Sequence, residues 1–151
     1  VCLLKKRGFS NNDFAKYHPG GALGKRLTLK VADLISQNPL PKVTENETVA
    51  NTIIEISKNR LGVTAVVKDN IIIGIITDGD IRRMLEKTTD ISTLKAKDIM
   101  GTNPKTINKN DMAVDALETM ENNSITQILV VENNKYVGVV HLHDLIKEGI
   151  F

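Results

Sequence analysis

The sequence predicts an α/β (α+β) fold made of two copies of one β-α-β-β-α unit, packed against each other about a pseudo-twofold axis. Residues 74–80 read GIITDGD, and residues 138–144 read GVVHLHD, 64 positions later (138 − 74). Each phrase keeps a glycine, two β-branched residues and a final aspartate, which indicates an internal repeat. Each unit also contains two β-branched runs separated by a polar turn. Hydrophobic residues make up 41% of the chain and aromatic residues only 3%, so the core is aliphatic, as in sheets covered by helices.

Bulk properties exclude several classes of protein. A length of 151 residues is enough to bury a sizeable core. The net charge of +2 is too small to indicate a nucleic-acid partner. The single cysteine, Cys2, excludes an internal disulfide and fits a reducing compartment. Because no apolar run approaches the roughly 20 residues of a membrane helix, we expect a cytoplasmic protein without a membrane partner.

The first 28 residues differ from the rest. Val1 to Arg7 reads as the end of a helix that Gly8 stops, so we expect the chain to be a piece of a longer protein. His18 begins the phrase HPGG, in which proline and paired glycines forbid regular structure. An unpaired histidine in such a loop is a candidate functional group, and a plain surface residue is the alternative.

The first unit is predicted over residues 31–86. Lys30 to Ile35 is expected to form a short helical turn, and Thr48 is expected to cap the next helix. That helix presents one apolar face through the spacing i, i+4, i+7, formed by Val49, Ile53 and Ile56.

A hairpin follows. The runs Val63–Val67 and Ile71–Thr77 are joined by a turn at Asp69–Asn70, and their continuous apolarity predicts that both sheet faces are covered. Thr77 or Asp78 is then expected to cap a helix from about Gly79 to Glu86.

The second unit, residues 95–151, repeats this order after a polar hinge at residues 87–94. Its expected elements are the short helix 97–100, a helix capped by Asp111, strands 126–131 and 135–141 with a turn at Asn133–Asn134, and the helix 142–147. The inward face of its long helix is expected to be Ala113, Ala116, Leu117 and Met120.

The end of the first phrase has the chemistry of a sugar-phosphate site. A strand ending at Thr77 runs directly into a helix, whose free N–H groups and positive dipole end favour phosphate. The carboxylate of Asp80 can accept both hydroxyls of a ribose diol, at about 1.5–3 kcal/mol for each sheltered hydrogen bond. Arg82 and Arg83 could neutralise phosphate charge. The alternative is that Asp78 and Asp80 only cap the helix; the duplicated spacing favours a binding site.

The second phrase departs from the first. His141 stands in place of Thr77, and His143 in place of Gly79, whereas Asp144 is kept. Two histidines in this spacing can ligate zinc. Here they straddle the predicted junction of strand and helix, with no cysteine or third histidine nearby, so we expect no metal site. His141 is expected to contact or block the ligand.

Both units resemble CBS domains, the regulatory modules named after cystathionine β-synthase, over about residues 31–85 and 96–150. The resemblance rests on the phrase at 74–80 and on LGVTAVV at 61–67. The second unit lacks the hydroxyl residue of the motif.

Residues 14–27, FAKYHPGGALGKRL, resemble the exit from a sugar isomerase (SIS) domain. Residues 1–28 are therefore expected to be the remnant of that domain and a linker. An SIS domain followed by a CBS pair that contains TDGDIRR (residues 77–83) is similar to the arabinose 5-phosphate isomerases of the capsule and Kdo (3-deoxy-manno-octulosonate) pathways.

The resemblance implies a function that composition does not reveal. Paired CBS domains usually bind adenosine nucleotides between the repeats and associate through helical faces into dimers or tetramers. In such isomerases the pair is regulatory, so AMP, ATP or the feedback ligand CMP-Kdo is the implied ligand. No other cofactor is expected.

The resemblance also assigns roles to residues. Thr77 and Asp80 are expected to hold ribose, with Asp144 serving the second, pseudo-symmetric site. The backbone of Val63, Thr64 and Ala65 is expected to line the pocket for the base.

His18 would assist proton transfer between D-arabinose 5-phosphate and D-ribulose 5-phosphate, in the intact parent enzyme only. Two rival interpretations are an isolated chain that retains isomerase activity, and a module that mediates only oligomerisation and has an empty cleft.

Overall fold

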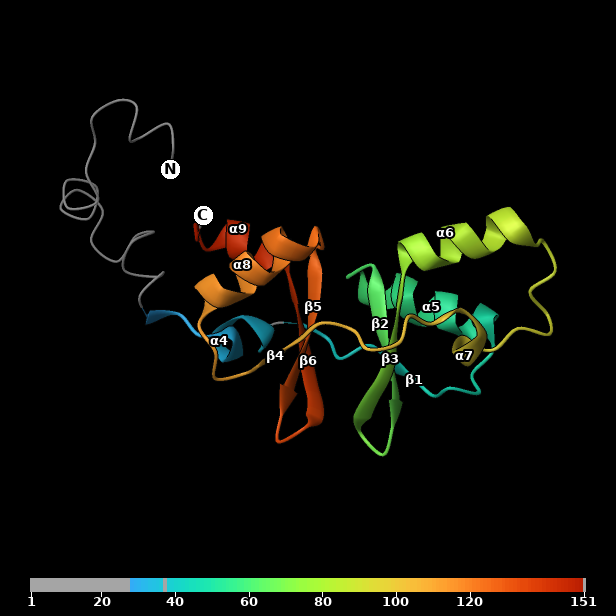
Figure 1. Ribbon diagram of the computed structural model, residues 1–151, viewed down its shortest axis with the longest axis horizontal. Helices are drawn as coiled ribbons and strands as arrows, with labels where there is room; N and C mark the ends of the chain where they lie inside the picture. Colours follow the sequence, from blue (N-terminus) through green and yellow to red (C-terminus); the bar gives the residue numbers. More distant parts are fainter. Residues whose placement is uncertain (1–27, 37, 151) are drawn as a thin grey trace, which may run out of the picture.

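The computed structural model describes residues 28–36 and 38–150 (Figure 1). The predictions for residues 1–27, including the helix end at Val1–Arg7, His18 and the isomerase-domain remnant, lie outside the described residues. No helix in the described part of the chain is long and apolar enough to cross a membrane.

The first half forms a mixed three-stranded sheet in the order β1-β2-β3. Strand β1 pairs parallel with β2, and β2 pairs antiparallel with β3. The elements of this half are β1 (Lys42–Val43), α5 (Val49–Asn59), β2 (Val63–Lys68), β3 (Ile71–Thr77) and α6 (Asp78–Lys87).

The second half repeats this topology with the sheet order β4-β5-β6. Its elements are β4 (Thr106–Asn108), α8 (Ala113–Asn123), β5 (Gln127–Glu132), β6 (Lys135–His141) and α9 (Leu142–Lys147). The prediction of a β-α-β-β-α unit present twice is confirmed.

Both hairpin turns are confirmed, and their residues explain them. The φ angles are 52° at Asp69 and 66° at Asn70, and 51° at Asn133 and 65° at Asn134. A two-residue turn with both φ values positive matches the right-handed twist of the flanking strands, and Asn and Asp tolerate that conformation best after glycine.

The cap of α5 is also confirmed. Thr48 Oγ1 accepts a 3.1 Å hydrogen bond from the backbone N–H of Asn51. Val49 and Ile56 are buried as predicted, whereas Ile53 is only half-buried. The helix ends at Asn59, and the C-cap residue Arg60 takes the left-handed conformation with φ of 60°.

The predicted cap of α8 is wrong. Asp111 lies one residue before the N-cap position, Met112, and its carboxylate accepts a bond from the backbone N–H of Asn108 in the preceding turn. The first N–H of α8, that of Ala113, instead donates to the carbonyl of Leu29 at 2.9 Å. A distant backbone segment therefore satisfies this helix end. The predicted inward face is correct, since Ala113, Ala116, Leu117 and Met120 are all buried.

Several other boundaries shift by one residue. The short helix α7 covers Ala96–Ile99 rather than residues 97–100, because Asp98 forms a capping box with the backbone of Lys95. Helix α6 begins at Asp78, and β5 begins at Gln127 rather than at residue 126.

The two short helices are exchanged between the halves. Helix α4 (Val31–Ile35) contacts α8 and β6, and α7 contacts α6 and β3, as Figure 1 shows. Val31 and Leu34 belong to the core of the second half, and Ala96 belongs to the core of the first. Each half is thus completed by a segment from the other part of the sequence.

Matching backbone hydrogen bonds hold both exchanged helices. The N–H of Val31 donates to Asp111 O at 2.9 Å, and that of Ala96 donates to Glu47 O at 2.8 Å. These pairs correspond in the two repeats, which supports the predicted pseudo-twofold relationship.

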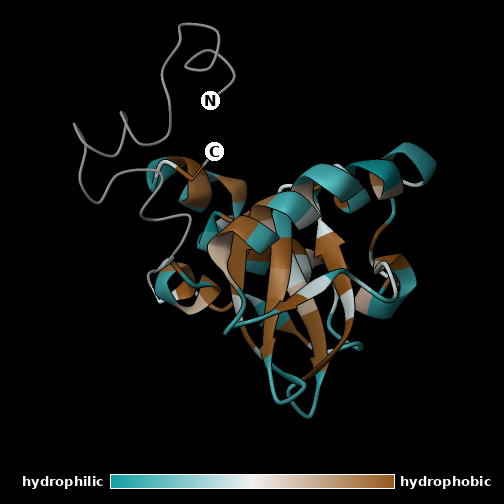
Figure 2. Cartoon of the chain, turned by 60° about the vertical axis from the view of Figure 1, so that its left-hand side comes forward, coloured by the Kyte–Doolittle hydropathy of each residue, from teal (hydrophilic) through white to brown (hydrophobic). Residues whose placement is uncertain are grey.

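A third apolar cluster joins the sheets. It contains Leu61, Val63, Ala65 and Val67 from the first half and Leu129, Tyr136 and Val139 from the second. The buried Tyr136 hydroxyl donates to Pro41 O at 2.7 Å across this interface. Figure 2 shows apolar strands inside and polar helix surfaces outside.

Candidate ligand site at the start of helix α6

The predicted pair Thr77 and Asp80 lies at the junction of β3 and α6. Thr77 is the N-cap, and its Oγ1 accepts a 3.2 Å hydrogen bond from the backbone N–H of Asp80. Oδ2 of Asp80 in return accepts from the backbone N–H and the hydroxyl of Thr77, at 2.9 and 3.1 Å. This reciprocal arrangement is a capping box, so Asp80 does help to cap α6. The alternative that it has no other role stays untested.

The other carboxylate oxygen of Asp80 has a different partner. Oδ1 accepts a 2.6 Å charge-assisted bond from Nη2 of Arg83, whose side chain is 65% exposed, while that of Asp80 is only 20% exposed. The guanidinium lies over the bare backbone of Gly79, because a Cβ there would be 3.3 Å from its Nη1. A glycine at this position therefore leaves room for Arg83 to fold back onto Asp80.

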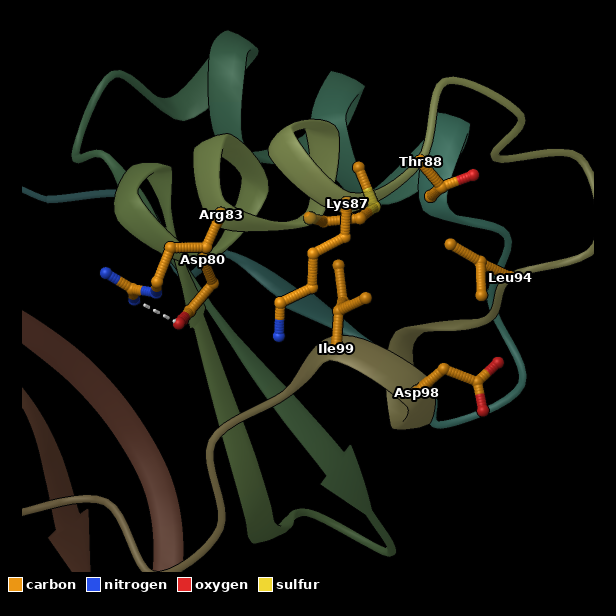
Figure 3. Close-up of a pocket in the computed structure, with 8 residues that line it drawn as sticks. Asp80, Arg83, Lys87, Thr88, Leu94, Asp98 and Ile99 are labelled. Carbon is orange, nitrogen blue, oxygen red and sulfur yellow. Dashed lines mark hydrogen bonds and ion pairs between the residues drawn. The ribbon is translucent and has the colours of Figure 1, made fainter.

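A pocket of about 370 Å³ opens beside this pair, between α6, α7 and the loop that joins them (Figure 3). Its residues come from both predicted repeats and from the predicted hinge between them: Asp80, Arg83, Met84, Lys87, Thr88, Leu94, Asp98 and Ile99. The side chain of Lys87 extends from α6 toward Ile99 of α7. The pocket thus combines two cations and two carboxylates with an apolar lining.

Only some of the predicted residues meet at this pocket. Asp80 and Arg83 line it, whereas Arg82 is exposed and lies outside the lining set. Val63, Thr64 and Ala65 are fully buried in β2, and their side chains do not line this pocket. The expected contact of their backbone with a base stays a prediction.

The second copy of the motif is held differently. Oδ2 of Asp144 accepts from the backbone N–H of His141 at 2.8 Å and from Nδ2 of Asn38 at 2.8 Å. Asn38 comes from the first half, three residues after the end of α4, and its amide also donates to Val139 O at 3.0 Å. Asn103, its counterpart in the sequence repeat, is exposed. The two sites therefore differ in their partners.

His141 serves as the N-cap of α9. Its Nδ1 accepts a 2.9 Å hydrogen bond from the backbone N–H of His143, which requires an unprotonated Nδ1. Burial lowers the pKa of His141, although the negative charge of Asp144 acts in the opposite direction. Within residues 28–36 and 38–150, no group of three or more His, Cys, Asp and Glu side chains could hold a metal ion.

The repeated glycines have a packing role. A Cβ on Gly74 would lie 2.5 Å from Sδ of Met100, and a Cβ on Gly138 would lie 2.9 Å from Cβ of Ile35. Met100 directly follows α7, and Ile35 ends α4. The glycine of each motif thus lets the exchanged segment approach the strand that leads to the aspartate.

Sequence reasoning missed the cross-repeat residues of both sites. Asp98 and Ile99 face α6 only because α7 is exchanged, and no local pattern marks them as pocket residues. The one sign of Asn38 in the sequence is that the dipeptide Asn-Pro occurs in both repeats, at 38–39 and at 103–104.

Comparison with known proteins agrees with this architecture. A family model described as the CBS domain matches residues 31–87 and 96–150. Among curated relatives, the arabinose 5-phosphate isomerase KdsD of Francisella tularensis is 44% identical over 149 residues, which cover 97% of this chain. The isomerases of the same name from Yersinia pestis and Escherichia coli K12 are 40% and 38% identical over 152 residues, or 99% of the chain. The chain spans 46% of the length of each.

Solved structures share the fold. The CBS domain of a membrane protein from Sphaerobacter thermophilus gives a TM-score of 0.74 at 22% identity, covering 92% of this chain and 98% of that one. The CBS domain protein PAE2072 from Pyrobaculum aerophilum, complexed with AMP, gives 0.70 at 25% identity, covering 78% and 90%.

Proposed function

This chain belongs to the CBS domain family, and from that membership we propose that it is a regulatory module that binds a ribonucleotide or a nucleotide sugar. The observation that carries the proposal is the Asp80 carboxylate, which is mostly sheltered and lies at the edge of a pocket of about 370 Å³. A sheltered carboxylate facing such a space is suited to a vicinal diol.

The hydrogen bonds of Asp80 leave room for a ligand. A carboxylate offers about four acceptor positions, and Thr77 and Arg83 occupy three of them. Thr77 already orients Oδ2, so the ribose would bind at Oδ1. The neighbouring cations Arg83 and Lys87 would lie close to a phosphate group.

Adenine nucleotides are the first candidates, because the structural relative PAE2072 was solved with AMP. CMP-Kdo is the second, because the resemblance to the isomerases of the Kdo pathway implies it as a feedback ligand. ATP, AMP and CMP-Kdo all carry the ribose diol and phosphate that this site requires.

The parent protein would be a D-arabinose 5-phosphate isomerase that interconverts D-arabinose 5-phosphate and D-ribulose 5-phosphate in Kdo or capsule biosynthesis. The identity of 38–44% to KdsD proteins over nearly the whole chain supports this. His18 would act in proton transfer in that parent, and the isolated chain would be inactive. The module would further associate into a dimer or tetramer.

Titration calorimetry of the chain with AMP, ATP and CMP-Kdo tests the binding. We expect at least one ligand to bind, and the Asp80→Asn variant to lose about ten- to hundredfold in affinity, because two sheltered hydrogen bonds weaken. The Glu55→Gln variant is a matched control, since Glu55 also has a 19% exposed side chain in an i,i+3 ion pair, on α5. Equal affinities in Asp80→Asn and the wild type would refute the ribose role.

A module that only mediates oligomerisation is the alternative function. It is favoured by the capping boxes, which account for both Asp80 and Asp144 without any ligand. Failure of all three nucleotides to raise the melting temperature would support this alternative.

A further inference from the structure

We propose that Arg83 makes the first site selective for phosphorylated ligands by exchanging its ion pair with Asp80 for one with the ligand's phosphate. This inference rests on the proposed nucleotide binding and adds a mechanism of selection. The residue that makes the selection is Arg83 of the first half. The ligands that it distinguishes are a ribonucleotide, which carries a phosphate, and a nucleoside, which does not.

The hydrogen bonds already made to Asp80 leave one acceptor position of its carboxylate open. Thr77 fills both acceptor positions of Oδ2, and Arg83 fills one of the two at Oδ1. A ribose diol brings two donors and finds one open position. Binding of the diol therefore displaces Arg83 from Oδ1.

Displacing Arg83 from Asp80 costs binding free energy unless the guanidinium finds another anion. The Arg83–Asp80 bond is short, at 2.6 Å, and one partner is largely sheltered. A nucleoside would break it and leave the guanidinium without an anionic partner. A nucleotide supplies a phosphate, with which a guanidinium forms strong bidentate hydrogen bonds.

The Arg83 side chain is placed so that it can reach a ligand in the pocket. Arg83 lines the pocket beside Asp80, and Lys87 lies one helical turn further along the same wall. The Arg83 side chain is 65% exposed, so no packing prevents it from turning from the carboxylate to a ligand in the pocket. A ribose on Asp80 would therefore have its phosphate beside the wall of the pocket that carries both cations.

The second half lacks this device. His143 and Lys147 stand at the positions that correspond to Gly79 and Arg83. Asp144 Oδ2 is held by Asn38 instead. Within the described residues no ion pair joins Lys147 to Asp144, so an ion pair that a phosphate could exchange is found at the first site and not at the second.

The test compares nucleotide and nucleoside at a reporter within the site. The backbone amide of Gly79 can be followed by ¹⁵N NMR during titration of the whole chain with AMP, adenosine, CMP and cytidine. In the wild type, the nucleotide should bind about tenfold more tightly than its nucleoside. In Arg83→Ala, the Kd for the nucleotide should rise about tenfold, while the Kd for the nucleoside should fall, because no ion pair has to break.

Opposite shifts for the two ligands are the signature, since a merely structural role would weaken both. Arg83→Gln provides a second variant that retains a polar side chain over Gly79. Lys58→Ala is the matched control, because Lys58 forms an i,i+3 pair with Glu55 at 3.1 Å and is 66% exposed. It should change neither Kd.

The outcomes separate the two proposals. If nucleotides bind but their preference over nucleosides is unchanged in both Arg83 variants, ion-pair exchange is refuted and nucleotide binding stands. If neither nucleotide moves the Gly79 resonance of the wild type, the inference falls together with nucleotide binding at this site.

Discussion

The side-chain amide of Asn38 donates a 2.8 Å hydrogen bond to Oδ2 of Asp144, so the first half supplies a partner for the acidic residue of the second. The same amide donates to Val139 O at 3.0 Å. The bonds to Asp144 and Val139 join residues that are 106 and 101 positions apart in the sequence, and both bonds are partly buried. Asn38 therefore links the end of α4 to the start of α9.

Replacing Asn38 by alanine should lower the free energy of unfolding by about 1–3 kcal/mol, since two partly buried hydrogen bonds are lost. Urea denaturation followed by circular dichroism measures this. Asn122→Ala is the control, because Asn122 is exposed on α8 and should change stability by less than about 0.5 kcal/mol. Equal stability of the two variants would contradict the role of Asn38.

The motif glycines give a second prediction. Gly138→Ala should destabilise the protein by about 1–3 kcal/mol, because the new methyl group overpacks against the rigid Cβ of Ile35. Gly74→Ala should also destabilise, because its Cβ would crowd both Met100 and the backbone oxygen of Gly101. Gly101→Ala is the control, since its nearest neighbour would be at 3.7 Å, an ordinary contact. Thermal melts of all three should place the control closest to the wild type.

A third prediction concerns the interface between the sheets. Burial raises the pKa of the Tyr136 hydroxyl well above its ordinary value, and the charge of Glu55 adds to this. The hydroxyl should stay protonated and continue to donate to Pro41 O at high pH. Tyr136→Phe should cost about 1 kcal/mol in the free energy of unfolding, measured by urea denaturation. Unchanged stability would show that this bond contributes nothing to joining the halves.

The fourth prediction follows from His141. Burial lowers its folded pKa below the ordinary 6.5, so the unfolded chain binds the proton more readily. The stability that His141 contributes is complete above about pH 6.5 and is lost as the pH falls through the lowered value. Protonation would also block Nδ1 as the acceptor for His143.

His141→Gln should therefore reduce the loss of stability between about pH 7.5 and 5.5. Urea denaturation across this range measures the slope. Asn122→Ala, the exposed α8 variant used above, is the control and should retain the wild-type slope, because it removes no titratable group. A variant at His141 with the full wild-type slope would show that another group controls this range.

Much of the fold could be predicted because its signals are local. Asp69–Asn70 and Asn133–Asn134 specify hairpin turns, since few other residues accept two positive φ values in succession. Thr48 caps α5 through its own hydroxyl. Asp111 misled the prediction, because α8 begins where the backbone of Leu29 satisfies its first N–H. A cap provided by a distant segment leaves no trace in the neighbouring sequence.

In the candidate site, too, the contacts between residues close in sequence could be predicted and the long-range contacts could not. Thr77, Asp80 and Arg83 lie within seven residues, and their mutual contacts follow from helical spacing. Asp98 belongs to the pocket only through tertiary packing of α7 against α6. The partner of Asp144 was equally hidden, because Asn38 reaches it from the other repeat.

The exchange of α4 has a mechanical consequence. Although α4 precedes β1 in the sequence, it rests on α8 and β6. A force applied to the chain at residue 28 would therefore load the contacts of α4 with the second half as well as the segment that leads on to β1. A displacement of α9 would in turn reach the end of α4 through Asn38.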